Sequence, residues 1–135
     1  MTGGGIGARL TSIPGSSKVL LGGVVAYTAQ AKTELLRIPA DFLSRHGPVS
    51  VEVAEAMAQA VRRHLHADYG CAITGNAGPT SDVDGKPVGL TYVAVAGPHG
   101  MRSEEFKYRG IREDIRRRAG QLALRTLREA LLADD

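Results

Sequence analysis

The sequence predicts an α/β protein, arranged as a three-layer α/β/α sandwich with a mixed β-sheet. Segments with the apolar spacing of amphipathic helices alternate along the chain with short apolar runs rich in β-branched residues. Such interleaving favours helices on both faces of a sheet over an all-helical or all-β arrangement. The 135 residues, 43% of them hydrophobic, are enough for one core and too few for two ordinary domains. A single domain over residues 1–135 is therefore expected.

The chain is predicted to open with a turn, a short helix and a strand. Residues 2–5 form a glycine-rich turn, and residues 6–10 follow as a short helix. Residues 19–27 are apolar apart from two adjacent glycines and rich in β-branched side chains. This pattern is typical of a buried strand, and the glycines indicate a bulge or a close backbone approach.

Three helices are predicted next. Thr28 is expected to cap the first, and Pro39 suits the opening turn of the second, which ends at His46 and Gly47. Ser50 opens the third and best defined helix. Its apolar residues recur at helical spacing, at Ala54, Met57, Ala58, Val61 and Leu65.

The second half is predicted to hold three strands and a long helix. Residues 69–74 form a compact apolar strand that breaks into a glycine-rich loop extending to Pro87. Residues 88–96 and 101–108 are expected to pair as an antiparallel hairpin, with the more charged second strand at the sheet edge. Residues 111–132 place apolar side chains on one face and arginines on the others, which indicates an amphipathic helix.

Composition limits the classes of function. The net charge of +3 is a mild excess that suits an anionic ligand without implying nucleic acid. Cys71 is the only cysteine, so an intrachain disulfide is excluded and a cytoplasmic location is expected. The sequence contains neither a secretory signal nor an apolar stretch long enough to cross a membrane. The histidines and Cys71 lack zinc-site spacing, so no metal and no cofactor are predicted.

Several short blocks occur in order along nearly the whole chain. They are TGG at residues 2–4, LTSIPGSS at 10–17, GGVVAY at 22–27 with AK at 31–32, HGPVS at 46–50, ITG at 73–75 with AGP at 77–79, KPVG at 86–89, and RG at 109–110 with Arg112. Together these blocks resemble the CinA C-terminal domain family. The resemblance implies the three-layer α/β/α sandwich and a serine amidohydrolase that converts nicotinamide mononucleotide to the corresponding acid with release of ammonia.

The resemblance also concerns where the sequence begins. In the family's usual pattern Glu-Ser-Cys precedes the glycine turn, and that serine is the nucleophile. Met1 stands at the place of the cysteine, so the serine is expected immediately upstream, together with the family's first helix and strand. Two explanations stay open: a gene start assigned too far downstream, or a shortened and inactive protein. The alternative function is therefore a catalytically inactive nucleotide-binding or regulatory module.

The resemblance implies two catalytic residues, Lys32 and Tyr27. Serine needs a base within hydrogen-bond reach, and a lysine can be that base only when burial or a nearby cation lowers its pKa. Lys32 lies beside the apolar face of its predicted helix, so partial burial is expected. Tyr27 ends the preceding strand, where its hydroxyl would orient or relay a proton. Without the resemblance, a solvated lysine and a packing tyrosine are the simpler interpretations.

The residues that the resemblance implies for substrate binding fall in two loops and two basic positions. The glycine turn would offer backbone N–H groups to an oxyanion or phosphate, and the loop after residue 74 lies at a strand end, where α/β sheets commonly bind ligands. Ammonium and guanidinium groups suit the substrate phosphate. The residues are Thr2, Gly3, Gly4, Thr74, Gly75, Ala77, Gly78, Lys86 and Arg112. Asn76 departs from the aliphatic residue often found there.

The expected partner is a small pyridine nucleotide, with neither nucleic acid nor membrane. A nucleic-acid-binding domain ranks last, because the chain has few aromatic residues for base stacking and its excess charge is small. A homo-oligomer is compatible with the sequence.

Overall fold

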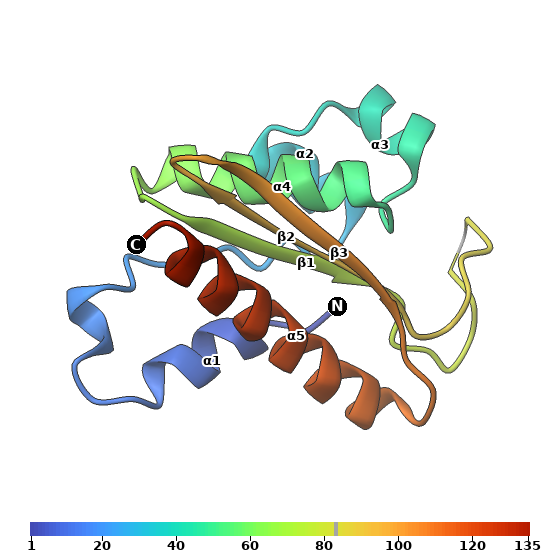
Figure 1. Cartoon of the computed structure of the whole chain (residues 1–135). Helices are drawn as coiled ribbons and strands as arrows, with labels where there is room; N and C mark the ends of the chain where they lie inside the picture. Colours follow the sequence, from blue (N-terminus) through green and yellow to red (C-terminus); the bar gives the residue numbers. More distant parts are fainter. Residues whose placement is uncertain (83) are drawn as a thin grey trace.

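The computed structural model describes residues 1–82 and 84–135, and it places a sheet between two layers of helices (Figure 1). The sheet has the order β1 (Gly70–Gly75), β2 (Leu90–Gly97), β3 (Gly100–Lys107). One layer contains α2 (Ala29–Leu36), α3 (Ala40–His46) and α4 (Val51–His64), and the other contains α1 (Gly5–Thr11) and α5 (Arg112–Ala133). A short 3₁₀ turn, Ser16–Lys18, follows α1. The predicted α/β class and its three layers are confirmed.

The sheet differs from the prediction in one respect, because both of its pairings are antiparallel. Residues 19–27, expected to be a buried strand, pair with no strand of the described chain, so this prediction is wrong and the parallel pairing of a mixed sheet is not observed. The side chains of Val19 and Val25 are 83% and 55% exposed. Val24 and Ala26 do pack against the core, so the segment alternates between inside and outside as an extended chain does. High strand propensity favours an extended backbone, but a β-strand also needs a neighbouring strand with which it can form hydrogen bonds.

The hairpin and the edge strand agree with the prediction. Strand β2 pairs with β3 from Leu90 opposite Lys107 to Gly97 opposite Gly100. Most residues of β2 are buried on both faces of the sheet, while most residues of β3 are exposed. Strand β3 is therefore an exposed edge strand, and its charged residues disfavour pairing with other chains.

The best defined predicted helix, α4, packs its apolar side on β1 and β2. The Ser50 hydroxyl accepts a hydrogen bond from the Val53 N–H at 3.3 Å, which caps the helix as predicted. Val53, Ala54 and Ala58 are fully buried. The two backbones approach so closely at Gly70 that a Cβ there would lie 2.8 Å from Arg62 Cβ and 2.9 Å from Arg62 N. The small residues of this interface let the helix lie directly on the sheet.

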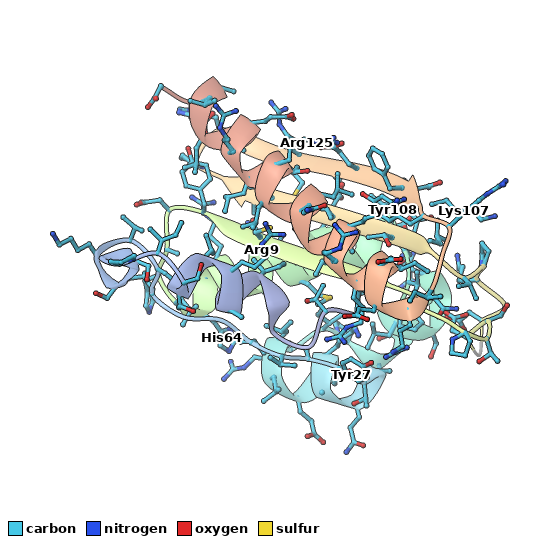
Figure 2. All side chains as sticks on the ribbon, turned by 90° about the horizontal axis from the view of Figure 1, so that it is seen from below. Arg9, Tyr27, His64, Lys107, Tyr108 and Arg125 are labelled. Carbon is cyan, nitrogen blue, oxygen red and sulfur yellow. The ribbon has the colours of Figure 1, made fainter. Side chains whose placement is uncertain are left out.

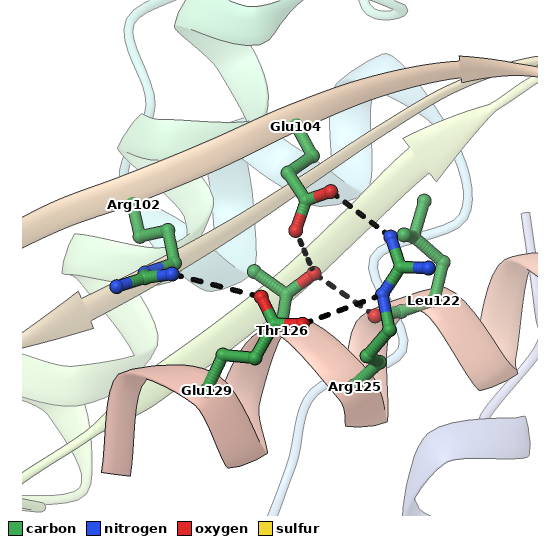
Figure 3. Close-up of polar contacts among 6 residues, drawn as sticks. All are labelled: Arg102, Glu104, Leu122, Arg125, Thr126 and Glu129. Atoms are coloured by element: carbon green, nitrogen blue, oxygen red, sulfur yellow. Dashed lines mark hydrogen bonds and ion pairs between the residues drawn. The ribbon is translucent and has the colours of Figure 1, made fainter. Parts of the chain in front are cut away.

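On the opposite face, polar contacts attach α5 to the edge strand (Figure 3). The fully buried Thr126 hydroxyl lies 2.7 Å from Glu104 Oε1 and 2.9 Å from the Leu122 carbonyl oxygen. Arg125 Nη2 lies 3.1 Å from Glu104 Oε2.

Among the described residues, no helix is both long enough and apolar enough to cross a membrane.

Candidate active site

A cavity of about 180 Å³ opens at the end of β1, where α2, the segment that precedes α4 and the loop after β1 meet. Its walls come from segments that are distant in the sequence. They are formed by Met1, Tyr27, Ala29, Lys32, Pro48, Val49, Thr74, Gly75, Asn76 and Asp82. The structure therefore brings together four of the predicted site residues, namely Tyr27, Lys32, Thr74 and Gly75.

Lys32 is a buried amine on the wall of this cavity. It occupies the first turns of α2, which Thr28 caps by accepting a hydrogen bond from the Ala31 N–H at 3.0 Å. Only 6% of Lys32 is exposed, and its Nζ donates a hydrogen bond to the Ala26 carbonyl oxygen at 3.2 Å. Burial lowers the pKa of Lys32 from the usual 10.5. The expected burial is observed, and it favours the neutral amine that a general base must be.

The lowered pKa predicts how stability depends on pH. The unfolded chain binds the Lys32 proton more tightly than the folded chain, so the free energy of unfolding should rise with pH between the lowered pKa and 10.5. Replacing Lys32 by methionine should remove this contribution, so that the stability of the parent relative to this variant increases toward alkaline pH. Urea denaturation at several pH values between 7 and 10 would measure the difference. The exposed Lys18 replaced by methionine is the control, and parallel curves for the parent and Lys32→Met would contradict the argument.

Thr74 lies at the carboxyl end of β1 with its hydroxyl already engaged. The side chain is buried, and Oγ1 donates a hydrogen bond to the Pro48 carbonyl oxygen at 2.7 Å. A threonine hydroxyl has one proton and two acceptor positions. Because the proton is used within the protein, Thr74 can only accept a hydrogen bond from a ligand. This orientation suits a ligand with an N–H or O–H group near the strand end.

Tyr27 lies at the rim of the cavity, and Arg112, which does not line the cavity itself, contacts Tyr27 there. Tyr27 is 54% exposed and lies next to α2 on the side of the molecule seen in Figure 2. The Arg112 guanidinium donates hydrogen bonds to the Tyr27 hydroxyl at 2.8 Å and to the Gly78 carbonyl oxygen at 2.6 Å. The first residue of α5 therefore connects the rim to the loop after β1.

The glycine turn lies next to the same helix. Gly3 and Gly4 have positive φ angles of 64° and 94°, which only glycine adopts without strain. Arg116 donates a hydrogen bond to the Thr2 carbonyl oxygen at 3.0 Å. Within residues 1–4, Met1 lines the cavity, whereas the predicted site residues Thr2, Gly3 and Gly4 do not. Arg116, although exposed, thus ties the turn to α5.

The loop after β1 is organised by Asn76. Its Nδ2 donates to the carbonyl oxygens of Thr80 and Lys86, at 3.0 and 3.4 Å, while its Oδ1 accepts from the Gly78 N–H at 2.9 Å. The departure from the family's aliphatic residue thus has a structural role. Ala77 is buried, and neither it nor Gly78 or Lys86 contributes to the cavity wall.

Asp82 is a charged wall residue that the sequence did not indicate as part of the site. Its Oδ1 accepts hydrogen bonds from the backbone N–H groups of Asp84 at 3.1 Å and Lys86 at 2.9 Å. This geometry is common for an aspartate at the start of a polar turn. The sequence around Asp82 therefore indicates a turn, and it does not indicate a ligand-binding residue.

The described residues contain no cluster of histidine, cysteine and acidic side chains able to hold a metal ion. Burial raises the pKa of the Cys71 thiol to about 12, so this thiol stays protonated at neutral pH. The chemistry available at the cavity is therefore that of an amine, hydroxyls and a carboxylate, provided by residues of the chain.

Comparison with known proteins identifies the family. Residues 1–131 match the family described as the CinA C-terminal domain. A CinA-like protein of Acaryochloris marina is 46% identical over 136 residues, which cover 99% of this chain and 32% of that relative. The chain thus spans about a third of the length of this curated relative.

Solved structures agree with this match. The competence/damage inducible protein CihA from Agrobacterium tumefaciens is 36% identical with a TM-score of 0.88, covering 93% of this chain and 78% of that one. The competence damage-inducible protein A from Klebsiella pneumoniae is 28% identical with a TM-score of 0.93, covering 97% and 81%. From the family match, the sequence identity and the shared fold, this chain belongs to the CinA C-terminal domain family.

Proposed function

We propose that this domain forms the substrate pocket and supplies the general base of an amidohydrolase that converts nicotinamide mononucleotide to nicotinic acid mononucleotide and ammonia. The observation that carries the proposal is the buried Lys32 amine on the wall of a cavity at the end of β1. An amine buried without a carboxylate partner among the described residues is unfavourable for stability, and such groups are concentrated at functional sites.

The reaction requires a nucleophile beside this amine. By the family resemblance, a serine would stand immediately before Met1, and Met1 lines the cavity. Consecutive Cα atoms are about 3.8 Å apart, so a residue joined to Met1 would lie at the edge of the same cavity. Neutral Lys32 would take the proton of the serine hydroxyl as it attacks the carboxamide carbon, and would then donate that proton to the departing ammonia. Water would then hydrolyse the acyl ester left on the serine, which releases the acid and restores the hydroxyl.

The size of the cavity suits one end of the substrate. Ligand pockets usually exceed about 300 Å³, whereas this cavity of about 180 Å³ has room for a ring-sized group. The nicotinamide would enter the cavity, where Thr74 can accept a hydrogen bond from the carboxamide N–H. The sugar and phosphate would lie toward the rim, near the Arg112 guanidinium.

Two chains that differ in one residue would test the proposal. Glu-Ser joined before Met1 should support release of ammonia from nicotinamide mononucleotide, whereas Glu-Ala at the same place should not, because it lacks the nucleophile. Ammonia would be measured with a coupled assay, and binding of the nucleotide by calorimetry.

The results separate the competing functions. Binding by both chains without ammonia from the serine chain would contradict the amidase and leave a nucleotide-binding module. If neither chain binds the nucleotide, the assignment of the pocket itself is wrong.

A further inference from the structure

Arg116 of α5 binds the turn at residues 2–4. Its Nη2 donates a hydrogen bond to the Thr2 carbonyl oxygen at 3.0 Å, and a Cβ at Gly3 would lie 3.6 Å from the same nitrogen. The neighbouring residues Ile115 and Ala119 are fully buried, so the helix is fixed where Arg116 projects from it. Within the described chain, no carboxylate pairs with Arg116. The guanidinium is therefore directed to the turn by a rigid support.

The Met1 side chain fixes the same turn from the other side. It packs against the buried cluster that contains Ile73 and Ala119. A Cβ at Gly75 would lie 2.8 Å from Met1 Cε, so the methionine lies directly on the end of β1. Thr2 is buried as well. One attachment through a side chain and one through a carbonyl group thus hold the backbone of these two residues beside the cavity.

The nitrogen of Met1, to which a preceding residue would be joined, lies among positive charges. The pKa of the Met1 amine is lowered from 8.0 to about 6, first by burial. Three cations add to this effect, namely Lys32, Arg112 and Arg116. A place that disfavours a further positive charge favours a negative one, such as the charge that develops on a serine oxygen as it loses its proton.

We propose that Arg116 positions the nucleophile of the proposed amidohydrolase by binding the Thr2 carbonyl oxygen. This inference rests on the proposed function. Because Met1 is held by its side chain and Thr2 by its carbonyl group, a serine joined to Met1 starts from a fixed point near the Lys32 amine. Reacting atoms must lie about 3 to 3.5 Å apart, and an error of about 1 Å can cost about a hundredfold in rate. Arg116 acts through the turn and is a positioning residue.

A tether that only stabilises the fold would have different consequences. Arg116 is exposed, so its removal should leave the core, Lys32 and Thr74 in place. A loss of stability alone would lower the melting temperature without changing the kinetics of the folded protein. A positioning role instead predicts a lower kcat at an unchanged KM, because the contacts with the bound substrate are kept and the alignment for attack is lost.

The test compares Arg116→Met with Arg117→Met in the chain that carries Glu-Ser before Met1. The control removes the same charge at the next position of α5, where Arg117 is exposed and pairs with Asp114 at 3.6 Å. Ammonia release from nicotinamide mononucleotide gives kcat and KM. A fluorophosphonate, from whose phosphorus the serine oxygen displaces fluoride, reports the reactivity of the serine without the nucleotide. Thermal melting verifies folding.

Arg116→Met is expected to lower both kcat and the rate of labelling about a hundredfold at unchanged KM, while Arg117→Met matches the parent. Parent rates in Arg116→Met, a change in KM alone, or an equal loss in Arg117→Met would overturn the inference and leave the proposed function standing. If the parent is labelled but releases no ammonia, the assignment of the substrate falls, and the labelling rates still decide whether Arg116 positions the serine. If the parent does neither, both proposals fall.

Discussion

Replacing Lys32 by methionine is expected to lower the rate of ammonia release about a thousandfold in the chain that carries Glu-Ser before Met1. Methionine has a similar length and apolar stem, so the α2 packing around this buried position should persist. What is lost is the amine that takes the serine proton, and a positioned general base contributes a factor of about 10² to 10⁴. Steady-state rates with nicotinamide mononucleotide would measure the loss.

Two further variants make the Lys32 result specific. Lys32→Arg keeps a positive charge but cannot give it up at accessible pH, so it should be as inactive as the methionine variant. Lys18→Met removes an exposed lysine and should keep the full rate. Substantial activity in Lys32→Arg would show that the charge, and not proton transfer, is what the reaction needs, and the proposed mechanism would have to be abandoned.

Alanine at Gly70 is expected to destabilise the fold by about 3 kcal/mol. Gly70 lies in β1 opposite Ala96, directly under α4. A Cβ at this position would overlap the Ala58 carbonyl oxygen and lie 2.9 Å from Arg62 N, and both are backbone atoms of the helix. A side chain can rotate away from a new methyl group, but a helix backbone must shift as a body. Urea denaturation would give the change in free energy of unfolding.

Gly120→Ala is the matched control for this prediction. Gly120 is buried in the middle of α5, and a Cβ there would meet nothing within 4 Å. Alanine should therefore stabilise the protein by about 0.5 to 1 kcal/mol, because it restricts the unfolded chain and favours helix. Equal losses in both variants would mean that the cost at Gly70 does not come from contact between helix and sheet.

The elements that follow from local pattern were predicted well. The sequence places the hairpin at 88–96 and 101–108, and the structure has Leu90–Gly97 and Gly100–Lys107. Helix α4 begins where the Ser50 cap predicts. Residues 19–27 show the opposite case. Their apolar and β-branched side chains predict an extended chain correctly, but pairing depends on a neighbouring strand, and no local pattern encodes that neighbour.

The residues of the site likewise fall into those that a local motif predicts and those that it does not. Lys32 and Thr74 were predicted from short motifs, and both line the cavity. Asp82 could not be predicted, because the different surroundings of its two oxygens arise only when the loop after β1 has folded. In the sequence it is one of several acidic residues in a polar turn. The burial of one oxygen is a property of the tertiary structure, which no spacing rule contains.

The Arg112 guanidinium is engaged by two hydrogen bonds before any ligand reaches the rim. Its hydrogen bonds to Gly78 and Tyr27 hold the guanidinium against two separate segments of the chain. A long, unrestrained arginine must be immobilised when it captures an anion, at an entropic cost of up to about 2 kcal/mol. In this protein the folded chain already holds the guanidinium by these hydrogen bonds, so less entropy is lost when an anion binds. The rim is thus preorganised, and a phosphate arriving there would encounter a stationary positive charge.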